Sequence, residues 1–141
     1  MLKIKIVVDT SVIIKWLSRD REESLTVADR LLSDTLDGKV ELLAPELSKY
    51  EVGNVLLFSK KLSASQGSIV LTQFYSLPIS FIAESDDLSK ETYNLASKLS
   101  ITYYDAAFMS LSKQYDAILV TENIKHQGKV SNIKVKALSD Y

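Results

Sequence analysis

Ile4-Lys5-Ile6-Val7-Val8-Asp9-Thr10-Ser11, near the start of the chain, is a β-branched apolar run that ends in a carboxylate. Strands that helices cover on both faces are almost continuously apolar, so this run predicts a buried parallel strand. In open α/β sheets, ligands bind outside the carboxyl ends of the strands, which is where Asp9 would lie. Asp9 is therefore the first candidate functional residue. The alternative is that it only caps the following helix, a role that Thr10 or Ser11 could also fill.

Length and composition favour one ordinary globular domain. Of the 141 residues, 46% are hydrophobic and 25% are charged, so we expect a single domain over 1–141 with its own core. Seventeen basic and eighteen acidic residues give a net charge of −1, so any binding of nucleic acid must come from local patches or bound metal. The chain has no cysteine, which excludes disulfides and thiolate chemistry. We find neither a signal peptide nor a membrane span, and expect a soluble, cytoplasmic protein with no membrane partner.

The rest of the chain alternates between helix and strand patterns. Helices are predicted at about 12–17, 24–36, 46–60, 63–77, 86–99 and 103–114, and further strands at 42–44, 79–82, 117–120 and 133–136. Pro45 is expected to open the third helix, and Ser63 with Gln66 forms a capping-box pattern. This order predicts an α/β fold, with a central parallel sheet of about five strands between helical layers. The two wholly apolar strands should be central neighbours whose carboxyl ends open into one crevice.

Further polar residues can reach that crevice. Glu51 lies on or beside the inward stripe of its helix, where a charged side chain is rarely buried unless it is paired or binds metal. The alternative is a boundary glutamate that reaches solvent. Asp105 lies in the first turn of a helix that must be largely buried, and stabilisation of the helix dipole is its alternative role. Thr121-Glu122-Asn123 follows the second central strand and should face the same crevice.

A cluster of carboxylates needs a cation or a proton, because like charges repel. An oxygen-rich, cysteine-free site suits Mg²⁺ or Mn²⁺, and metal-assisted phosphodiester hydrolysis is the chemistry that needs such a site. Glu46 and His126 are weaker candidates, since a first-turn glutamate favours the helix dipole and a histidine in a polar loop is usually solvated. Lys15, Arg19 and Lys125 could contact phosphates, although each also fits a solvated face.

Four segments of the chain together match one family's order and spacing. They are Val7-Val8-Asp9-Thr10-Ser11-Val12 with Lys15-Trp16, Ala44-Pro45-Glu46-Leu47 leading to Glu51-Val52-Gly53-Asn54-Val55-Leu56, Tyr104-Asp105-Ala106-Ala107, and Leu119-Val120-Thr121. On these segments the chain resembles the PIN-domain family, and within it the VapC-type ribonuclease toxins of toxin–antitoxin pairs. The resemblance implies a PIN-like three-layer α/β/α fold, an RNA substrate, Mg²⁺ or Mn²⁺, an antitoxin partner and a homodimer.

The resemblance also assigns residues. Asp9, Glu51 and Asp105 match the family's catalytic, metal-binding acids. Hydroxyl positions near the ions are matched by Thr10, Ser11 and Thr121. The fourth acid of the family corresponds to Asn123, which can still coordinate through its carbonyl oxygen but brings no charge, so a second metal would be held more weakly.

Glu122 directly precedes Asn123, the position at which the sequence departs from the family's pattern. Adjacent side chains at a strand end point to opposite faces, so Glu122 should point away from the metals if Asn123 keeps the family's orientation. A rotated turn would instead make Glu122 the ligand.

Other interpretations stay open. The chain could be a PIN-like RNA-binding or scaffolding protein that lost catalysis through the change at Asn123. A phosphotransfer domain with Asp9 as nucleophile ranks last, because the second aspartate of dehalogenase-like phosphatases is missing and Glu51 would have no role. Four large apolar side chains also predict an exposed surface for a protein partner: Trp16, Leu17, Phe74 and Tyr75.

Overall fold

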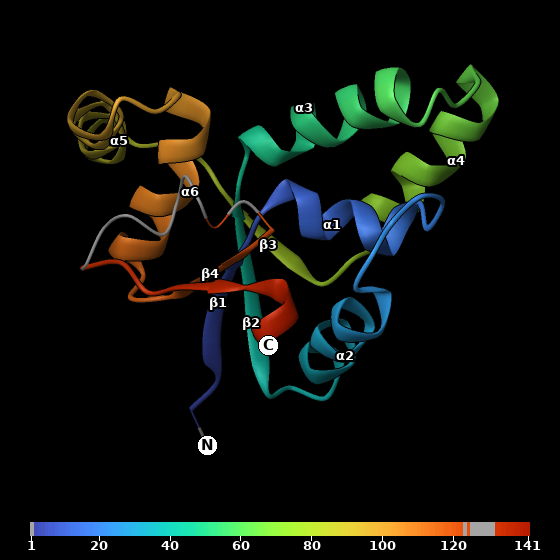
Figure 1. Cartoon of the computed structure of the whole chain (residues 1–141), viewed down its shortest axis with the longest axis horizontal. Helices are drawn as coiled ribbons and strands as arrows, with labels where there is room; N and C mark the ends of the chain where they lie inside the picture. The colour runs from blue at the N-terminus through green and yellow to red at the C-terminus, as the bar shows by residue number, and fades with distance from the viewer. Residues whose placement is uncertain (1, 123, 125–131) are drawn as a thin grey trace.

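A five-stranded parallel sheet forms the centre of the computed structural model, which describes residues 2–122, 124 and 132–141 (Figure 1). The strand order is β3-β2-β1-β4-β5, and every neighbouring pair is parallel. The strands are β1 (Ile4–Val8), β2 (Val40–Pro45), β3 (Ile79–Ile82), β4 (Ile118–Thr121) and β5 (Val135–Ala137). The predicted sheet is confirmed, with the two wholly apolar strands β1 and β4 side by side.

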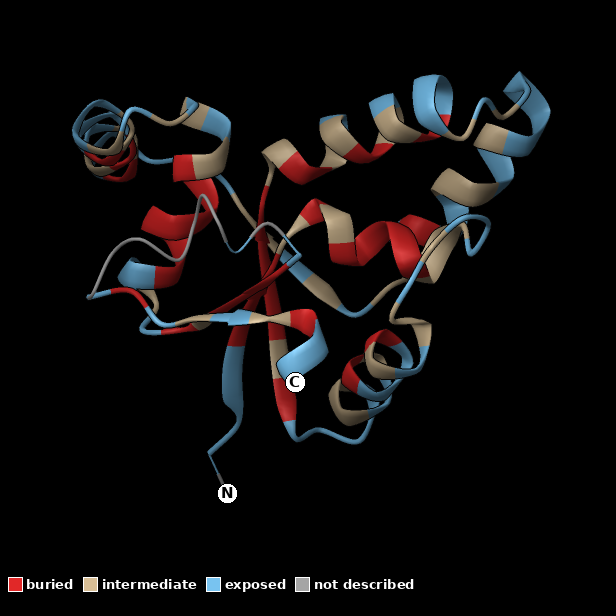
Figure 2. Ribbon diagram, viewed as in Figure 1, coloured by how far each residue is buried: buried red, intermediate tan, exposed pale blue. Residues whose placement is uncertain are grey.

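Helices cover both faces of the sheet, which gives the predicted three-layer α/β/α fold (Figures 1 and 2). One layer contains α1 (Thr10–Leu17), α2 (Leu25–Leu36), α3 (Leu47–Asn54), η1 (Val55–Ser59) and α4 (Ala64–Tyr75), and the other contains α5 (Asp86–Leu99) and α6 (Tyr103–Gln114). Ile6 and Val8 of β1 pack in the first core and Val7 in the second. Burial on both faces explains why this strand is apolar without alternation.

The predicted helix over 46–60 is present but is not one regular α-helix. Pro45 ends β2 instead of opening the helix, and α3 begins at Leu47. After Asn54 the chain continues as the π-helix η1, where the Lys60 amide donates to the Val55 carbonyl at 2.9 Å, five residues back. Such wide turns are uncommon and often lie beside functional sites.

Other local predictions are confirmed with small shifts of boundary. Ser63 and Gln66 form the reciprocal capping box, with hydrogen bonds of 3.2 and 2.9 Å. The last predicted strand lies at an edge of the sheet as β5 and leads into a short 3₁₀ helix, η2 (Leu138–Asp140). None of the helices in the described ranges is both long and apolar enough to span a bilayer.

The prediction of an exposed apolar surface is wrong for most of its residues. Phe74 is fully buried, in edge-on ring contact with Phe81 of the edge strand β3. Trp16 and Leu17 are partly buried against the same core, and the Trp16 indole donates to the Ala28 carbonyl at 2.7 Å. Only Tyr75 of the four is exposed. Helical spacing does not show that β3 covers Phe74 or that α2 covers Trp16.

Candidate active site

Asp9 lies where β1 ends and α1 begins, at the carboxyl edge of the sheet. It occupies the N-cap position, but its side chain makes no capping hydrogen bond. Its Oδ2 atom instead accepts hydrogen bonds from Ser11 at 2.8 Å and from Thr121, the last residue of β4, at 3.0 Å. The side-chain capping role that the sequence left open for Asp9 is therefore not the one that the structure shows.

Glu51 reaches the same region from α3. Its carboxylate is half-buried, and Oε1 accepts a hydrogen bond from the Thr10 hydroxyl at 2.7 Å. Thr10 itself is buried in the first turn of α1. All three hydroxyl residues that the sequence placed near the acids therefore contact an acid, and together they orient both Asp9 and Glu51.

Asp105 approaches from the opposite helical layer. Thr102 caps α6 by accepting the Asp105 amide at 3.0 Å, and the buried Ala106 and Ala107 bring this turn against the sheet. Asp105 lines one cavity of about 800 Å³ together with Asp9 and Glu51. The structure therefore brings the three predicted acids together, from three elements far apart in the sequence.

Burial and mutual repulsion change how these acids bind protons. Burial raises the pKa of Asp9; the hydrogen bonds from Ser11 and Thr121 oppose that rise, and the charge of Asp105 adds to it. Burial also raises the pKa of Glu51, against the hydrogen bond from Thr10, and the charges of Asp9 and Asp105 raise it further. A cation bound among these groups would relieve both the repulsion and the cost of burial.

The donor set fits a hard divalent cation, because it offers carboxylate and hydroxyl oxygens and no sulfur. Asp9, Glu51 and Asp105 would hold Mg²⁺ or Mn²⁺ there. Within the described ranges, however, no three acidic or histidine side chains are gathered closely enough to hold one ion. The acids would have to close further once a cation offsets their charge. Asn123 and His126 lie outside the described residues, so the assignment of Asn123 stays a prediction.

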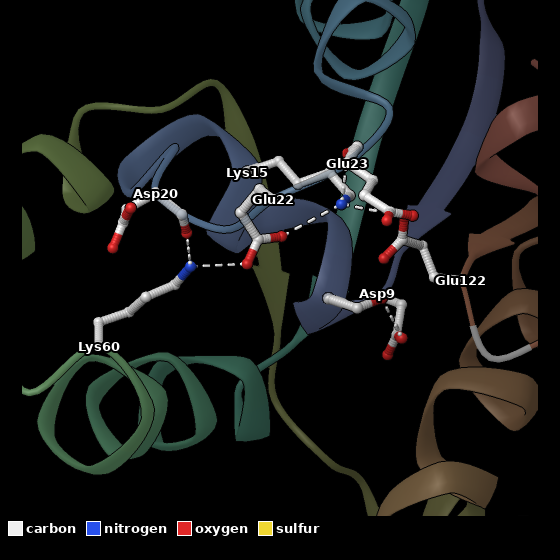
Figure 3. Close-up of polar contacts among 8 residues, drawn as sticks. Asp9, Lys15, Asp20, Glu22, Glu23, Lys60 and Glu122 are labelled. Carbon is white, nitrogen blue, oxygen red and sulfur yellow. Dashed lines mark hydrogen bonds and ion pairs between the residues drawn. The ribbon is translucent and has the colours of Figure 1, made fainter.

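Lys15 is not placed to meet a phosphate. Its side chain is only 1% exposed, and Nζ donates to Glu22 Oε1 at 3.1 Å, to Glu122 Oε1 at 2.9 Å and to the Glu23 carbonyl at 2.6 Å (Figure 3). Burial lowers the pKa of Lys15, but the hydrogen bonds to Glu122 and Glu22 more than offset that effect and raise it overall. The ammonium group stays charged and occupied, so its role is structural.

Glu122 lines the same cavity as Asp9, and so is not turned to the far face of the sheet. Its carboxylate is paired with Lys15, and the choice between Glu122 and Asn123 as the fourth ligand stays a prediction. Arg19 forms a two-pronged ion pair with Asp29, both contacts at 3.0 Å, on the surface outside this cavity. RNA contact by Arg19 stays a prediction, and Lys125 lies outside the described residues.

The cavity has a second wall that sequence reasoning missed. Lys60, directly after η1, donates to Glu22 Oε2 at 2.7 Å and to the Asp20 carbonyl at 2.5 Å. Glu22 therefore lies between two lysines, and despite its burial their hydrogen bonds lower its pKa. The only sequence signal was the charged run over 19–23, which does not reveal that Glu22 has a partner 38 residues later. By contrast, Glu46 pairs with Lys49 at 2.9 Å and lies outside this cavity.

Comparison with known proteins agrees with this architecture. The family model of the PIN domain matches residues 6–130. A search of curated proteins gives no match.

Solved structures with the same fold include toxin–antitoxin proteins. VapBC2 from Rickettsia felis, bound to a DNA fragment from its promoter, has a TM-score of 0.74 at 18% identity, covering 95% of this chain and 98% of that one. DNA-bound VapBC from Salmonella typhimurium has a TM-score of 0.74 at 15% identity, covering 96% and 98%. VapC20 from Mycobacterium tuberculosis, a sarcin–ricin loop cleaving toxin, has a TM-score of 0.68 at 12% identity, covering 92% and 98%.

Neutralising the acids should stabilise the metal-free protein. The raised pKa values of Asp9 and Glu51 mean that the folded state is more stable when these two acids are protonated than when they are ionised. That advantage is fully present below about pH 4 and is lost as the pH rises through the raised values. Asp9→Asn and Glu51→Gln should therefore raise the melting temperature at neutral pH by a few degrees in the presence of chelator.

Thermal unfolding over a pH series measures this effect, with Glu46→Gln as the control, because Glu46 directly precedes α3 and lies outside the cavity. The gain should shrink as the pH falls toward 4, and Mn²⁺ should stabilise the unmodified chain more than either variant. Lower melting temperatures for both variants in chelator would contradict the predicted repulsion.

Proposed function

Because the chain belongs to the PIN domain family, we propose that it is a metal-dependent endoribonuclease and the toxin of a type II toxin–antitoxin pair. The observation that carries the proposal is the meeting of Asp9, Glu51 and Asp105 in one cavity, with two of these acids oriented by hydroxyl groups. A sarcin–ricin loop cleaving toxin among the structures with this fold supports RNA as the substrate.

The bound cation and the side chains of the chain have different roles in the proposed hydrolysis. Mg²⁺ or Mn²⁺, when bound, would activate water and stabilise negative charge on the phosphate and leaving oxygen. The chain's own part is to hold and orient the ligands. Ser11 and Thr121 both donate to Oδ2 of Asp9, and Thr10 donates to Oε1 of Glu51, so neither carboxylate rotates freely. Such supporting hydrogen bonds usually contribute about 10–100-fold to metal affinity or activity.

Cleavage of RNA should depend on each acid. With Mg²⁺ or Mn²⁺, the purified chain should cleave total RNA, and chelator should stop the reaction. Asp9→Asn, Glu51→Gln and Asp105→Asn should each lower the rate at least about a hundredfold, with losses that are not additive because the acids act as a unit. Thr121→Val should lose about 10–100-fold.

Glu46→Gln is the matched control, since this glutamate lies near Glu51 in sequence but outside the cavity, and it should keep full activity. Full activity in Asp105→Asn would remove that residue from the site. Binding of RNA without cleavage by the unmodified chain would favour a catalytically impaired RNA-binding or scaffolding protein instead.

An antitoxin partner forms part of the proposal, supported by the toxin–antitoxin complexes among the structures with this fold. Induced expression of the chain in bacteria should arrest growth, and Asp9→Asn should abolish the arrest. Co-expression of the product of the adjacent reading frame should restore growth and yield a stable complex. Arrest that persists in Asp9→Asn would separate toxicity from catalysis.

A homodimer is the second proposed assembly. Several large apolar side chains on α3, η1 and α4 are exposed, which is a common feature of protein interfaces: Tyr50, Leu57, Phe58, Ile69 and Tyr75. Light scattering should give a molar mass twice the 15.8 kDa of the chain. A constant mass of one chain up to high concentration would contradict the dimer.

A further inference from the structure

The cavity has a second wall facing its acids. This wall comes from the loop between α1 and α2 and from the residues at the end of η1. Its members are Asp20, Arg21, Glu22, Ser59, Lys60 and Lys61. The two walls differ in chemistry, because the first offers acids to a cation and the second contains basic side chains.

Two lysines at this end of the molecule are already occupied. Lys15 is 1% exposed and Lys60 is 9% exposed, and both bind the Glu22 carboxylate. Each also binds a backbone carbonyl of the loop: Lys15 binds that of Glu23, and Lys60 binds that of Asp20 (Figure 3). These charges fix the loop against α1 and the end of η1, and both ammonium groups are already paired with a carboxylate.

Arg21 and Lys61 differ from this pair. The Arg21 side chain is 87% exposed, and its nearest carboxylate in the described chain is that of Asp20, at 3.9 Å. Lys61 is exposed and makes no ion pair within 4.0 Å with any residue that the structure describes. Among the described basic side chains that line the cavity, Arg21 and Lys61 are exposed and available to a ligand.

A hydrogen bond joins the two segments that carry these cations. Lys60 Nζ binds the Asp20 carbonyl, so the residue before Arg21 is tied to the residue before Lys61. Both cations also adopt left-handed backbone conformations, with φ of +58° for Arg21 and +56° for Lys61. Such conformations are unfavourable for residues with a Cβ atom and often occur at functional sites. Nothing local in an exposed turn requires arginine or lysine here, and glycine would fit better.

We propose that Arg21 and Lys61 bind backbone phosphates of single-stranded RNA at the mouth of the cavity, an inference that rests on the proposed ribonuclease function. A polyanion that approaches a wall of acids needs compensating positive charge nearby, and exposed arginine and lysine supply it to phosphates without reading sequence. The contacts position the RNA across the acids, so they act on binding and leave the chemical step unchanged.

Glycine variants test this assignment without disturbing the fold. Arg21→Gly and Lys61→Gly remove the cation from a backbone conformation that glycine adopts readily. Ser24→Gly is the control for flexibility, because Ser24 lies in the same loop with φ of +56° and carries no charge. The double change Lys3→Gln, Lys39→Gln is the control for net charge, because both lysines are exposed at the opposite edge of the sheet.

Fluorescence anisotropy gives the binding readout, with a short fluorescein-labelled single-stranded RNA of mixed sequence. All variants carry Asp9→Asn, so that the probe is not cleaved. Each lost phosphate contact should make the slope of log affinity against log salt less negative by about 0.7. The slope of the Arg21→Gly, Lys61→Gly double variant should therefore be less negative by about 1.4. Both controls should keep the slope. With Asp9 restored, the double variant should raise KM and keep kcat.

A double variant with the same slope and KM as the net-charge control would overturn the assignment, even if the unmodified chain cleaves RNA. If the unmodified chain cleaves no RNA while the glycine variants show the expected change in slope, the proposed nuclease is overturned and the binding site stands. The two failures are therefore distinguishable.

Discussion

The hydrogen bond that Asp9 accepts from Thr121 joins the carboxyl ends of β1 and β4, and the rest of the site depends on this junction. Ser11 donates a second, local hydrogen bond to the same carboxylate oxygen. The junction requires the two strands to be neighbours, which follows from their wholly apolar sequences and their burial between two helical layers. It also turns the Asp9 carboxylate away from helix capping. Thr10, the residue after Asp9, adds Glu51 to this arrangement, so the hydroxyl groups of Thr10, Ser11 and Thr121 together orient two acids.

Sequence reasoning found this half of the cavity because its determinants are local. An apolar run that ends in an acid and two hydroxyls already indicates a strand end at a parallel sheet edge, and Asp105 lies in a first turn next to small buried residues. The other half depends on distant pairs. Glu22 contacts Lys60, 38 residues away, and Lys15 contacts Glu122 across the sheet edge. A lysine on an amphipathic helix is normally solvated, and no spacing rule shows that Lys15 is buried between carboxylates. Phe74 was misjudged for the same reason, since its cover comes from β3.

The two walls use buried charge in opposite ways. On one wall, Asp9 and Glu51 are half-buried near the charge of Asp105, an arrangement that costs stability until a cation balances it. On the other, Glu22 is compensated by two lysines and Lys15 by two glutamates. Lys15 is almost fully buried, so loss of Glu22 would leave its charge poorly compensated, and the network therefore favours one position of the loop. Its stable geometry allows the loop to carry strained residues such as Arg21 beside acids that repel one another.

Pairing with Lys15 also bears on how many cations the proposed site would hold. Because the Glu122 charge is balanced by an ammonium group, this carboxylate contributes little to the attraction for a divalent ion, although it lines the cavity. Asp9, Glu51 and Asp105 then supply the carboxylate charge, which one Mg²⁺ or Mn²⁺ largely offsets. A second ion would need oxygen ligands from elsewhere, and RNA phosphate is the ligand that the proposed reaction brings. Cations that hold the RNA backbone at the cavity mouth would thus help to assemble the metal site as well as bind the substrate.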